Sequence, residues 1–181
     1  MTKLRMQFLV LGVVVCSIAD CGNSLAQVNT ETEAPSLVGQ KALDYLKGLK
    51  GKWIVDGGDE GKFGWEFDVT SRGSIVVERL KVGTETEMMT VYYLDSGKLH
   101  AQHYCQLKNR PHLTAVSKSD DGDVHFLCNE KVGGTESHDE LHMHGVHFHK
   151  KDVGVLIWMD MVKDGEVAFQ TKYKLVRAES K

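Results

Sequence analysis

The pattern of apolar and polar positions divides the chain into one amphipathic stretch followed by a series of short alternating segments. Leucines recur at helical spacing in residues 36–49, and Ser36 can act as the N-cap, which predicts one short helix. From residue 51 onward the period changes to two, and turns containing glycine and aspartate separate the segments. Ten strands are expected, over residues 52–56, 63–70, 74–82, 85–95, 98–107, 112–118, 123–130, 140–150, 153–162 and 166–177.

The order of these segments predicts the fold class. Consecutive strands joined by tight turns must run antiparallel. About ten such strands in one domain are best accommodated by closing the sheet, because closure removes the unpaired edges. We therefore predict an all-β, up-and-down antiparallel barrel preceded by one short N-terminal helix. The barrel domain covers residues 36–177, and residues 178–181 form a tail.

The clearest hairpin turns at Ser96 and Gly97. With these two residues as the loop, the expected cross-strand pairs are Leu94 with Leu99, Tyr92 with Ala101, Thr90 with His103, and Met88 with Cys105. Side chains alternate faces along a strand, so all eight lie on one side of the hairpin. That side is apolar near the turn and carries a histidine and a thiol further along, which suits the lining of a pocket.

The last three strands predict a second part of the interior. Two turns are assumed, one of three residues at 163–165 and one at Lys151-Asp152. The expected pairs are Phe169 with Met159, Thr171 with Ile157, Tyr173 with Val155, Val155 with Phe148, Ile157 with Val146, Met159 with His144, and Met161 with His142. This register turns His142 and His144 inward and His147 and His149 outward. A slip of one residue would exchange the two histidine pairs.

The N-terminus has the features of a secretory signal peptide. Lys3 and Arg5 precede an apolar run over residues 8–19, and Ser-Leu-Ala at 24–26 suits cleavage. The run is too short to cross a bilayer. We predict a cleaved signal over residues 1–26, a periplasmic or secreted mature protein and no transmembrane segment.

Two further details concern this region. A lipoprotein signal is the alternative, because Cys21 follows an apolar run, although Asp20 stands where such a signal has a small residue. Residues 27–35 are polar and acidic, which predicts a flexible linker.

Charge and cysteine content bear on two questions, nucleic-acid binding and the presence of a disulfide. The signal peptide carries two basic and one acidic side chain, so its removal moves the net charge from −3 to −4, which argues against nucleic-acid binding. Cys105 and Cys128 then remain. Their strands flank a third, so the Cα atoms are expected roughly 9–10 Å apart, beyond the limit of about 7 Å for a disulfide. Two unpaired thiols are expected, although export allows a bridge.

Histidine is abundant, with nine residues, four of them within residues 142–149. They can form a polar outer surface with one or two hydrogen-bonded interior histidines. Alternatively they belong to a haem or divalent-metal site. His142 and His144 would lie about 6.6 Å apart at Cα on one strand face, which suits two ligands of one ion, with His103 as the candidate third ligand. Both interpretations stay open.

A family resemblance rests on residues at both ends of the predicted barrel. Gly51-Lys52-Trp53 resembles the Gly-x-Trp signature of the calycins, which include lipocalins, fatty-acid-binding proteins and nitrobindin-like haem proteins. Calycins also place an arginine of the last strand over that tryptophan, and Arg177 stands in the corresponding position. The resemblance implies a barrel, with Trp53 and Arg177 in structural roles, and a tendency to bind small apolar or cofactor ligands.

The middle of the chain is similar to a group of uncharacterised bacterial secreted lipocalin-like proteins. The similarity is carried by residues 87–92, 103–105, 109–111 and 142–144. Arg110 departs from that pattern, which has glutamine there. The resemblance covers residues 46–177.

Together these features predict an exported barrel that binds a small, largely apolar ligand. The candidate ligand-binding residues are Met88, Thr90, Tyr92, His103, Cys105, Val146, Phe148 and Met159. One alternative is a haem- or metal-binding barrel with slow redox or isomerase-like chemistry, and another is a filled barrel with a structural or interaction role. No Ser/His/Asp arrangement, phosphate-binding loop or paired carboxylate stands out in the sequence, so an enzyme is not favoured.

Overall fold

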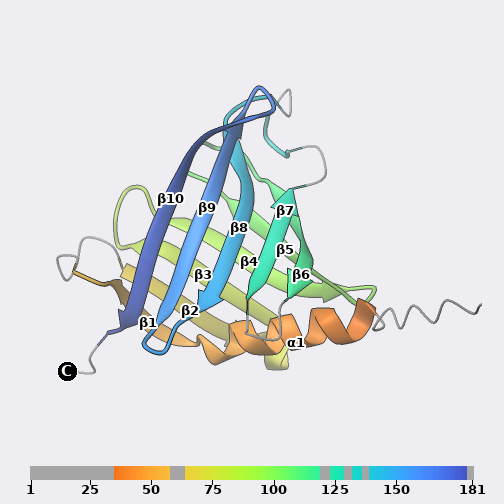
Figure 1. Cartoon of the computed structure of the whole chain (residues 1–181), viewed down its shortest axis with the longest axis vertical. Helices are drawn as coiled ribbons and strands as arrows, with labels where there is room; N and C mark the ends of the chain where they lie inside the picture. Colours follow the sequence, from red (N-terminus) through yellow and green to blue (C-terminus); the bar gives the residue numbers. More distant parts are fainter. Residues whose placement is uncertain (1–34, 58–63, 119–122, 129–131, 136–138, 179–181) are drawn as a thin grey trace, which may run out of the picture. The chain divides into compact units, whose positions relative to one another are not determined.

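The described part of the chain forms a closed antiparallel β-barrel with one helix, as the sequence predicted. The structure is a computed structural model and describes residues 35–57, 64–118, 123–128, 132–135 and 139–178. The ten strands follow each other around the barrel, and the circle closes where β1 pairs with β10 (Figure 1). The predicted signal peptide and most of the predicted linker lie outside the described residues.

The elements agree closely with the expected ranges. They are α1 (Pro35–Gly48), β1 (Gly51–Val55), β2 (Gly64–Thr70), the 3-10 turn η1 (Ser71–Gly73), β3 (Ile75–Val82), β4 (Met88–Asp95), β5 (Lys98–Tyr104), β6 (His112–Lys118), β7 (Val124–Cys128), β8 (His142–Lys150), β9 (Val155–Lys163) and β10 (Glu166–Arg177).

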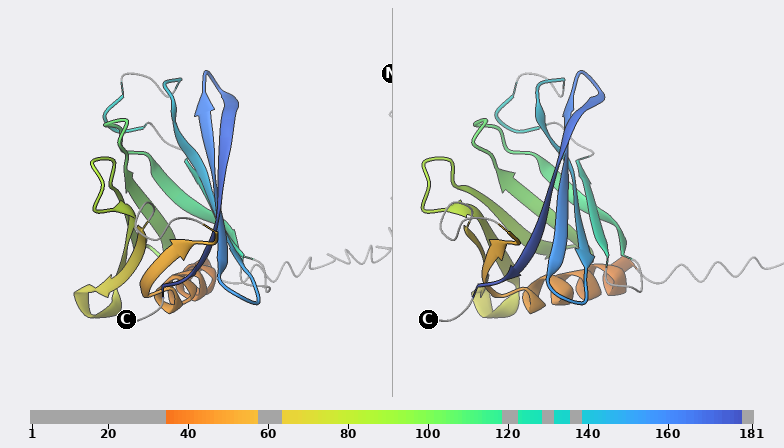
Figure 2. Two further views of the ribbon diagram at one scale, coloured as in Figure 1. Left: turned by 90° about the vertical axis from the view of Figure 1, so that its left-hand side faces the viewer. Right: turned by 60° about the vertical axis from the view of Figure 1, so that its left-hand side comes forward.

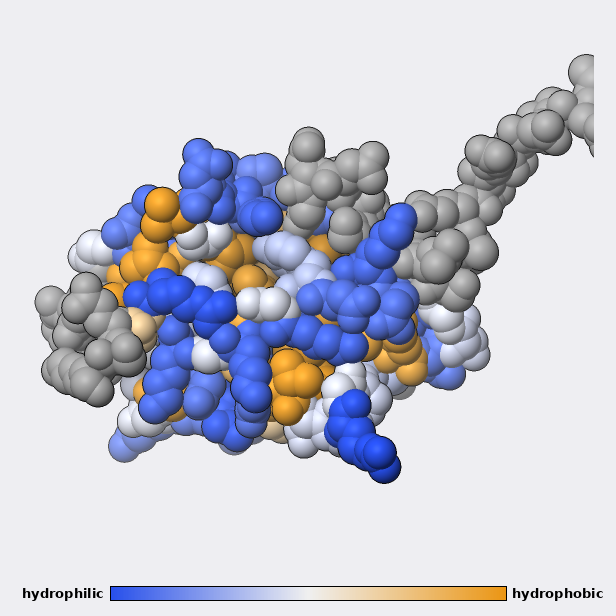
Figure 3. All heavy atoms as spheres, turned by 90° about the horizontal axis from the view of Figure 1, so that it is seen from below, coloured by the Kyte–Doolittle hydropathy of each residue, from blue (hydrophilic) through white to orange (hydrophobic). Residues whose placement is uncertain are grey.

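Helix α1 lies across one end of the barrel in each of the three views (Figures 1 and 2). Its apolar side, with Ala42, Leu43 and Leu46, is buried against the strands. Gly39 lets the helix approach the β4–β5 turn closely, because a Cβ there would lie 2.5 Å from the carbonyl oxygen of Gly97. Among the described residues, no helix is both long and apolar enough to cross a membrane. Figure 3 views the helix end, where hydrophilic residues dominate and apolar ones show between them.

The contact between Trp53 and Arg177 joins the first strand to the last. The two residues are cross-strand partners, and the Arg177 guanidinium carbon lies 4.1 Å from the centroid of the indole. Trp53 also donates from Nε1 to the carbonyl oxygen of Leu49 at 2.7 Å. The predicted pairing of these two residues is therefore present.

The register of the β4–β5 hairpin is the predicted one. Leu94 pairs with Leu99, Tyr92 with Ala101 and Thr90 with His103. Ser96 and Gly97 both have positive φ, 49° and 77°, as a two-residue loop of this type requires.

The predicted registers of the last three strands are wrong by two residues. Thr171 faces Met159 rather than Ile157, and Ile157 faces Phe148 rather than Val146. One cause is turn length: Lys163 pairs with Glu166, so the β9–β10 loop has two residues, and the β8–β9 loop runs from Lys151 to Gly154. A shift of two residues keeps each side chain on its face, so the predicted interior holds from Val146 to the end of β8 and along β9. At the start of β8 the prediction is wrong by one residue: Met161 faces Met143 rather than His142, so the alternation predicted for His142 and His144 does not hold there. The buried members of that interior are Val146, Phe148, Val155, Ile157, Met159 and Leu175.

The part of the interior nearer α1 is filled by aromatic side chains. Tyr92 packs against Phe126 and Phe148, with ring centroids 5.4 and 6.0 Å apart, and Phe67 reaches Phe148 at 6.4 Å. All four rings are buried. Rings packed this closely leave little space for a ligand between them at that depth of the barrel.

Candidate functional site

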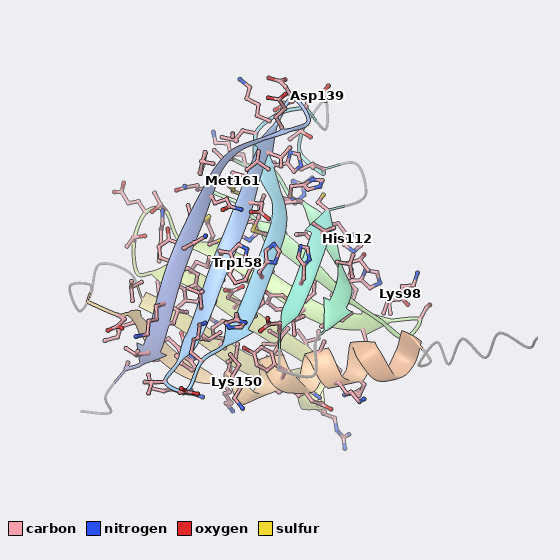
Figure 4. All side chains as sticks on the ribbon, viewed as in Figure 1. Lys98, His112, Asp139, Lys150, Trp158 and Met161 are labelled. Atoms are coloured by element: carbon pink, nitrogen blue, oxygen red, sulfur yellow. The ribbon has the colours of Figure 1, made fainter. Side chains whose placement is uncertain are left out.

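A cavity opens at the barrel end away from α1. Its volume is about 150 Å³, and its walls come from the ends of β3–β5 and β8–β10 with the connections between them. Figure 4 labels Met161, one of the wall residues, nearer that end of β9 than Trp158. The wall is mainly apolar, and it includes Met88, Met143, Met159, Met161, Phe169 and Tyr173. Unbranched methionine side chains let such a wall adjust to different ligand shapes.

The predicted ligand-binding residues divide into two groups. Met88, His103, Cys105 and Met159 line the cavity. Thr90, Tyr92, Val146 and Phe148 are buried but do not line it. The second group belongs to the packed part of the interior, where the aromatic rings already occupy the space between the strands.

A buried carboxyl group lies beneath the cavity wall, and the sequence interpretation missed it. Glu78 is 2% exposed, accepts from Trp65 Nε1 at 2.6 Å and accepts from the Tyr92 hydroxyl at 2.5 Å. The Thr90 hydroxyl, on the paired residue of β4, also hydrogen-bonds to Glu78. Burial raises the pKa of the Glu78 carboxyl, and these three donors oppose the rise. Burial next to Glu78 also raises the pKa of Tyr92, which keeps its hydroxyl protonated as a donor.

His103 connects this network to the cavity. Its Nδ1 lies 2.9 Å from the Thr90 hydroxyl oxygen. Either atom of the Thr90–His103 pair can be the donor; we assign the proton to His103 Nδ1 because the Thr90 hydroxyl also neighbours the Glu78 carboxyl, and this assignment leaves a lone pair on Nε2. Burial lowers the pKa of His103 to about 4, so the ring is neutral at pH 7. The cavity wall therefore contains one neutral imidazole, and the hydrogen bond to Thr90 fixes the orientation of its ring.

Cys105 contributes a thiol rather than a thiolate to the cavity wall. Burial raises the pKa of Cys105, although backbone N–H groups of the following loop and the Lys81 charge partly offset the rise. A protonated thiol of this kind acts as a small apolar wall group and a weak nucleophile.

The structure brings together two of the three predicted metal ligands. His142 and His144 lie next to each other, with Nε2 of the first 3.2 Å from Nδ1 of the second. The third group beside them is Cys128 rather than His103, and one ligand atom from each of the three residues lies within 4.8 Å of the others. A β-bulge between Met143 and Gly145 shifts His144 out of the regular alternation.

The other two histidines of β8 occupy the outer surface, as expected from the alternation. His147 is half-buried there, stacked on Trp158 with ring centroids 4.5 Å apart, and its Nε2 lies 3.0 Å from an Asp160 carboxylate oxygen. His149 pairs with Asp123. These contacts hold His147 against β9 and His149 against Asp123, the residue before β7.

Comparison with known proteins adds no family name to this chain. No protein-family profile, curated protein or solved structure matches it significantly. The arrangement of residues in the barrel must therefore carry the functional argument alone.

Proposed function

We propose that this protein is an exported, calycin-like barrel that binds a small and largely apolar ligand carrying one hydrogen-bond donor. The single observation that carries the proposal is the combination of an apolar cavity with one fixed, neutral imidazole in its wall. Ligand sites typically pair an apolar lining with a few oriented polar groups of this kind.

The chemistry of His103 suggests the donor. Its Nδ1 lies against the Thr90 hydroxyl, and in the assigned tautomer its Nε2 carries a lone pair. An unprotonated ring nitrogen accepts a hydrogen bond and cannot donate one. A hydroxyl or N–H group on the ligand can donate to His103 Nε2. A ligand carboxylate cannot, because it has no proton to donate and would repel the ring nitrogen.

The cavity volume suggests the size of the ligand. About 150 Å³ is below the roughly 300–1,000 Å³ of sites for drug-sized molecules. A cavity of about this volume in another protein holds benzene. The dimensions therefore favour a ligand near one aromatic ring in size over a haem.

The calycin assignment is supported by residues that act outside the cavity. Gly51 and Trp53 begin the first strand directly after the helix, and Arg177 of the last strand covers the indole. Export is supported by the basic start, apolar run and Ser-Leu-Ala sequence within residues 1–26. Mass spectrometry of the mature protein tests export: a chain beginning near Gln27 agrees with it, and a lipid-modified Cys21 contradicts the soluble form.

Calorimetric titration with phenol and toluene tests the ligand proposal. The two probes have almost the same shape, and only phenol carries a donor. We expect phenol to bind the wild type at least as tightly as toluene, despite being less hydrophobic, because it satisfies His103 Nε2. In His103→Phe the order should reverse, since an unmatched buried polar group costs about 1–3 kcal/mol.

Two matched variants locate the binding. Thr171 lines the cavity, and Lys172 is the next residue of β10, exposed on the outer face. Thr171→Trp should fill the cavity and abolish phenol binding, whereas Lys172→Trp should bind as the wild type does. The proposal is wrong if neither phenol nor toluene binds the wild type, or if Thr171→Trp and Lys172→Trp bind phenol equally well.

A further inference from the structure

A second candidate site lies beside the ligand cavity, where β7 ends and β8 begins. Cys128 is the last residue of β7, and His142 and His144 are the first and third residues of β8, the strand that pairs with it. Cys128 and His142 are almost fully buried, at 1% and 0% exposure, and His144 is partly buried. Two paired strands thus place one thiol and two imidazoles side by side, largely shielded from solvent.

The spacing of the two imidazoles matches a metal site. Tetrahedral zinc with Zn–N bonds of about 2.0–2.1 Å separates two nitrogen ligands by roughly 3.3 Å. His142 Nε2 and His144 Nδ1 are 3.2 Å apart. The Cys128 sulfur lies within 4.8 Å of the ligand atoms of both histidines, so about 1 Å of side-chain movement would complete the triangle.

The tautomer of His142 also suits metal binding. Its Nδ1 lies 2.7 Å from the carbonyl oxygen of Glu140, which can only accept, so Nδ1 carries the proton. Nε2 is then the nitrogen with the lone pair, and it is the atom that faces His144. Imidazoles that bind metals almost always donate their other N–H to such a carbonyl or carboxylate.

The backbone around the ligands is held by a separate loop. Asn109 donates from Nδ2 to the carbonyl oxygen of Leu141 at 2.9 Å, immediately before His142. Arg110 of the same loop exchanges backbone hydrogen bonds with Gly133. Asn109 Oδ1 is buried and has no hydrogen-bond partner within the described residues. A buried amide oxygen in this loop can accept a hydrogen bond from a water molecule that completes the coordination of a metal ion.

We propose that Cys128, His142 and His144 form a three-ligand site for a transition-metal ion of the zinc class. A thiolate with two imidazoles selects Zn²⁺ or copper over Mg²⁺ and Ca²⁺, which prefer oxygen ligands. Binding breaks the Cys128 S–H bond and forms a sulfur–metal bond, so one proton leaves to solvent and no electron is transferred. The His144 proton moves from Nδ1 to Nε2. The site is independent of the ligand proposal, because none of its three residues lines the cavity.

Titration of the reduced protein with Co²⁺, followed by Zn²⁺ displacement, tests the proposal. One equivalent of Co²⁺ should produce a near-ultraviolet sulfur-to-cobalt band with the visible bands of a four-coordinate ion. Zn²⁺ should remove both sets of bands, and a pH indicator should record one proton released per ion.

Matched variants connect the spectrum to the three residues. Cys128→Ser should abolish the sulfur-to-cobalt band, whereas Cys105→Ser, which changes the other thiol, should retain it. His144→Ala should weaken Co²⁺ binding by more than the roughly 10–100-fold that losing an outer-shell partner costs, and His149→Ala should leave it unchanged. His144 is only partly buried, so its variant remains informative if His142→Ala does not fold.

The opposite results would overturn the site. No sulfur-to-cobalt band in the wild type, or a band that survives Cys128→Ser, rules out Cys128 as a ligand. Equal losses from His144→Ala and His149→Ala would identify loose chelation by surface histidines instead.

Discussion

The Arg177 guanidinium lies over the face of the Trp53 indole, 4.1 Å from the ring centroid, and joins the last strand to the first. The same guanidinium donates to the carbonyl oxygens of Gly48, Leu49 and Lys50, where α1 ends. One side chain therefore closes the barrel and satisfies the C-terminal carbonyls of the helix.

Arg177→Ala should lower the free energy of unfolding by about 1–2 kcal/mol, because it removes the stacking and the contacts with the helix end. Lys174→Ala, on the same strand, removes only the exposed ion pair with Asp56 and should cost less than about 1 kcal/mol. Urea unfolding of both variants measures the difference. If the two variants lost the same unfolding free energy, Arg177 would stabilise the protein no more than an exposed ion pair does.

Glu78 gives a second test of the interior. Glu78→Ala leaves the Trp65 N–H and the Tyr92 hydroxyl buried without their acceptor, so we expect a loss of roughly 3 kcal/mol or more. Glu66→Ala is the control, because Glu66 forms a partly exposed ion pair with Arg79 and should cost about 0–1 kcal/mol. A Glu78 variant as stable as the Glu66 variant would contradict the buried network.

Two glycines with positive φ separate backbone strain from steric overlap. Gly154 and Gly165 have φ of 87° and 77°, but only at Gly154 would a Cβ overlap an atom, the carbonyl oxygen of Leu175. Gly165→Ala should cost about 1–2 kcal/mol, the usual penalty for a left-handed residue. Gly154→Ala should cost clearly more, because β10 must also move. Thermal unfolding of the two variants decides this, and equal melting temperatures would contradict the described packing of the β8–β9 turn.

Acid should weaken the protein through His103. Its pKa in the folded state is about 4, below the ordinary 6.5, so the unfolded chain binds the proton more readily between these values. The stability that His103 contributes is complete above about pH 6.5 and is lost as the pH falls toward 4. NMR titration of the His103 ring should show a neutral Nδ1–H imidazole down to about pH 4, and titration near pH 6.5 contradicts the assignment. His103→Gln should show a shallower loss of unfolding free energy over the same interval.

The sequence predicted the parts of this fold that local chemistry determines. The Ser96-Gly97 loop permits one register, so three of the predicted β4–β5 pairs are confirmed, and the fourth, Met88 with Cys105, lies beyond the end of β5 at Tyr104. The loops at 151–154 and 164–165 allow several lengths, and there the register was wrong by two residues. Alternation alone could have identified Glu78, because it shares a face with Val76 and Leu80, both buried. It was missed because carboxylates were assigned to the outer face.

The candidate metal ligands show a different limit of the sequence. The His-x-His spacing identified His142 and His144, but the bulge between Met143 and Gly145 turns His144 out of strict alternation. Gly145 is the signal that could have indicated it, because an isolated glycine inside a strand pattern often marks a bulge. An up-and-down barrel already implies that β7 and β8 pair, but the long connection between them leaves the register open, and it is the register that brings Cys128 beside the two histidines.

Methyl NMR of methionine-labelled protein tests ligand binding in the cavity most directly. Met88, Met143, Met159 and Met161 line the cavity, and Met89 is an internal control because it is exposed on the outer face of the same strand as Met88. Addition of phenol should shift the four cavity methyl signals in a saturable way and leave Met89 unchanged. Shifts of Met89 equal to the others, or no saturable shift of the four, would contradict a ligand-binding cavity at this end of the barrel.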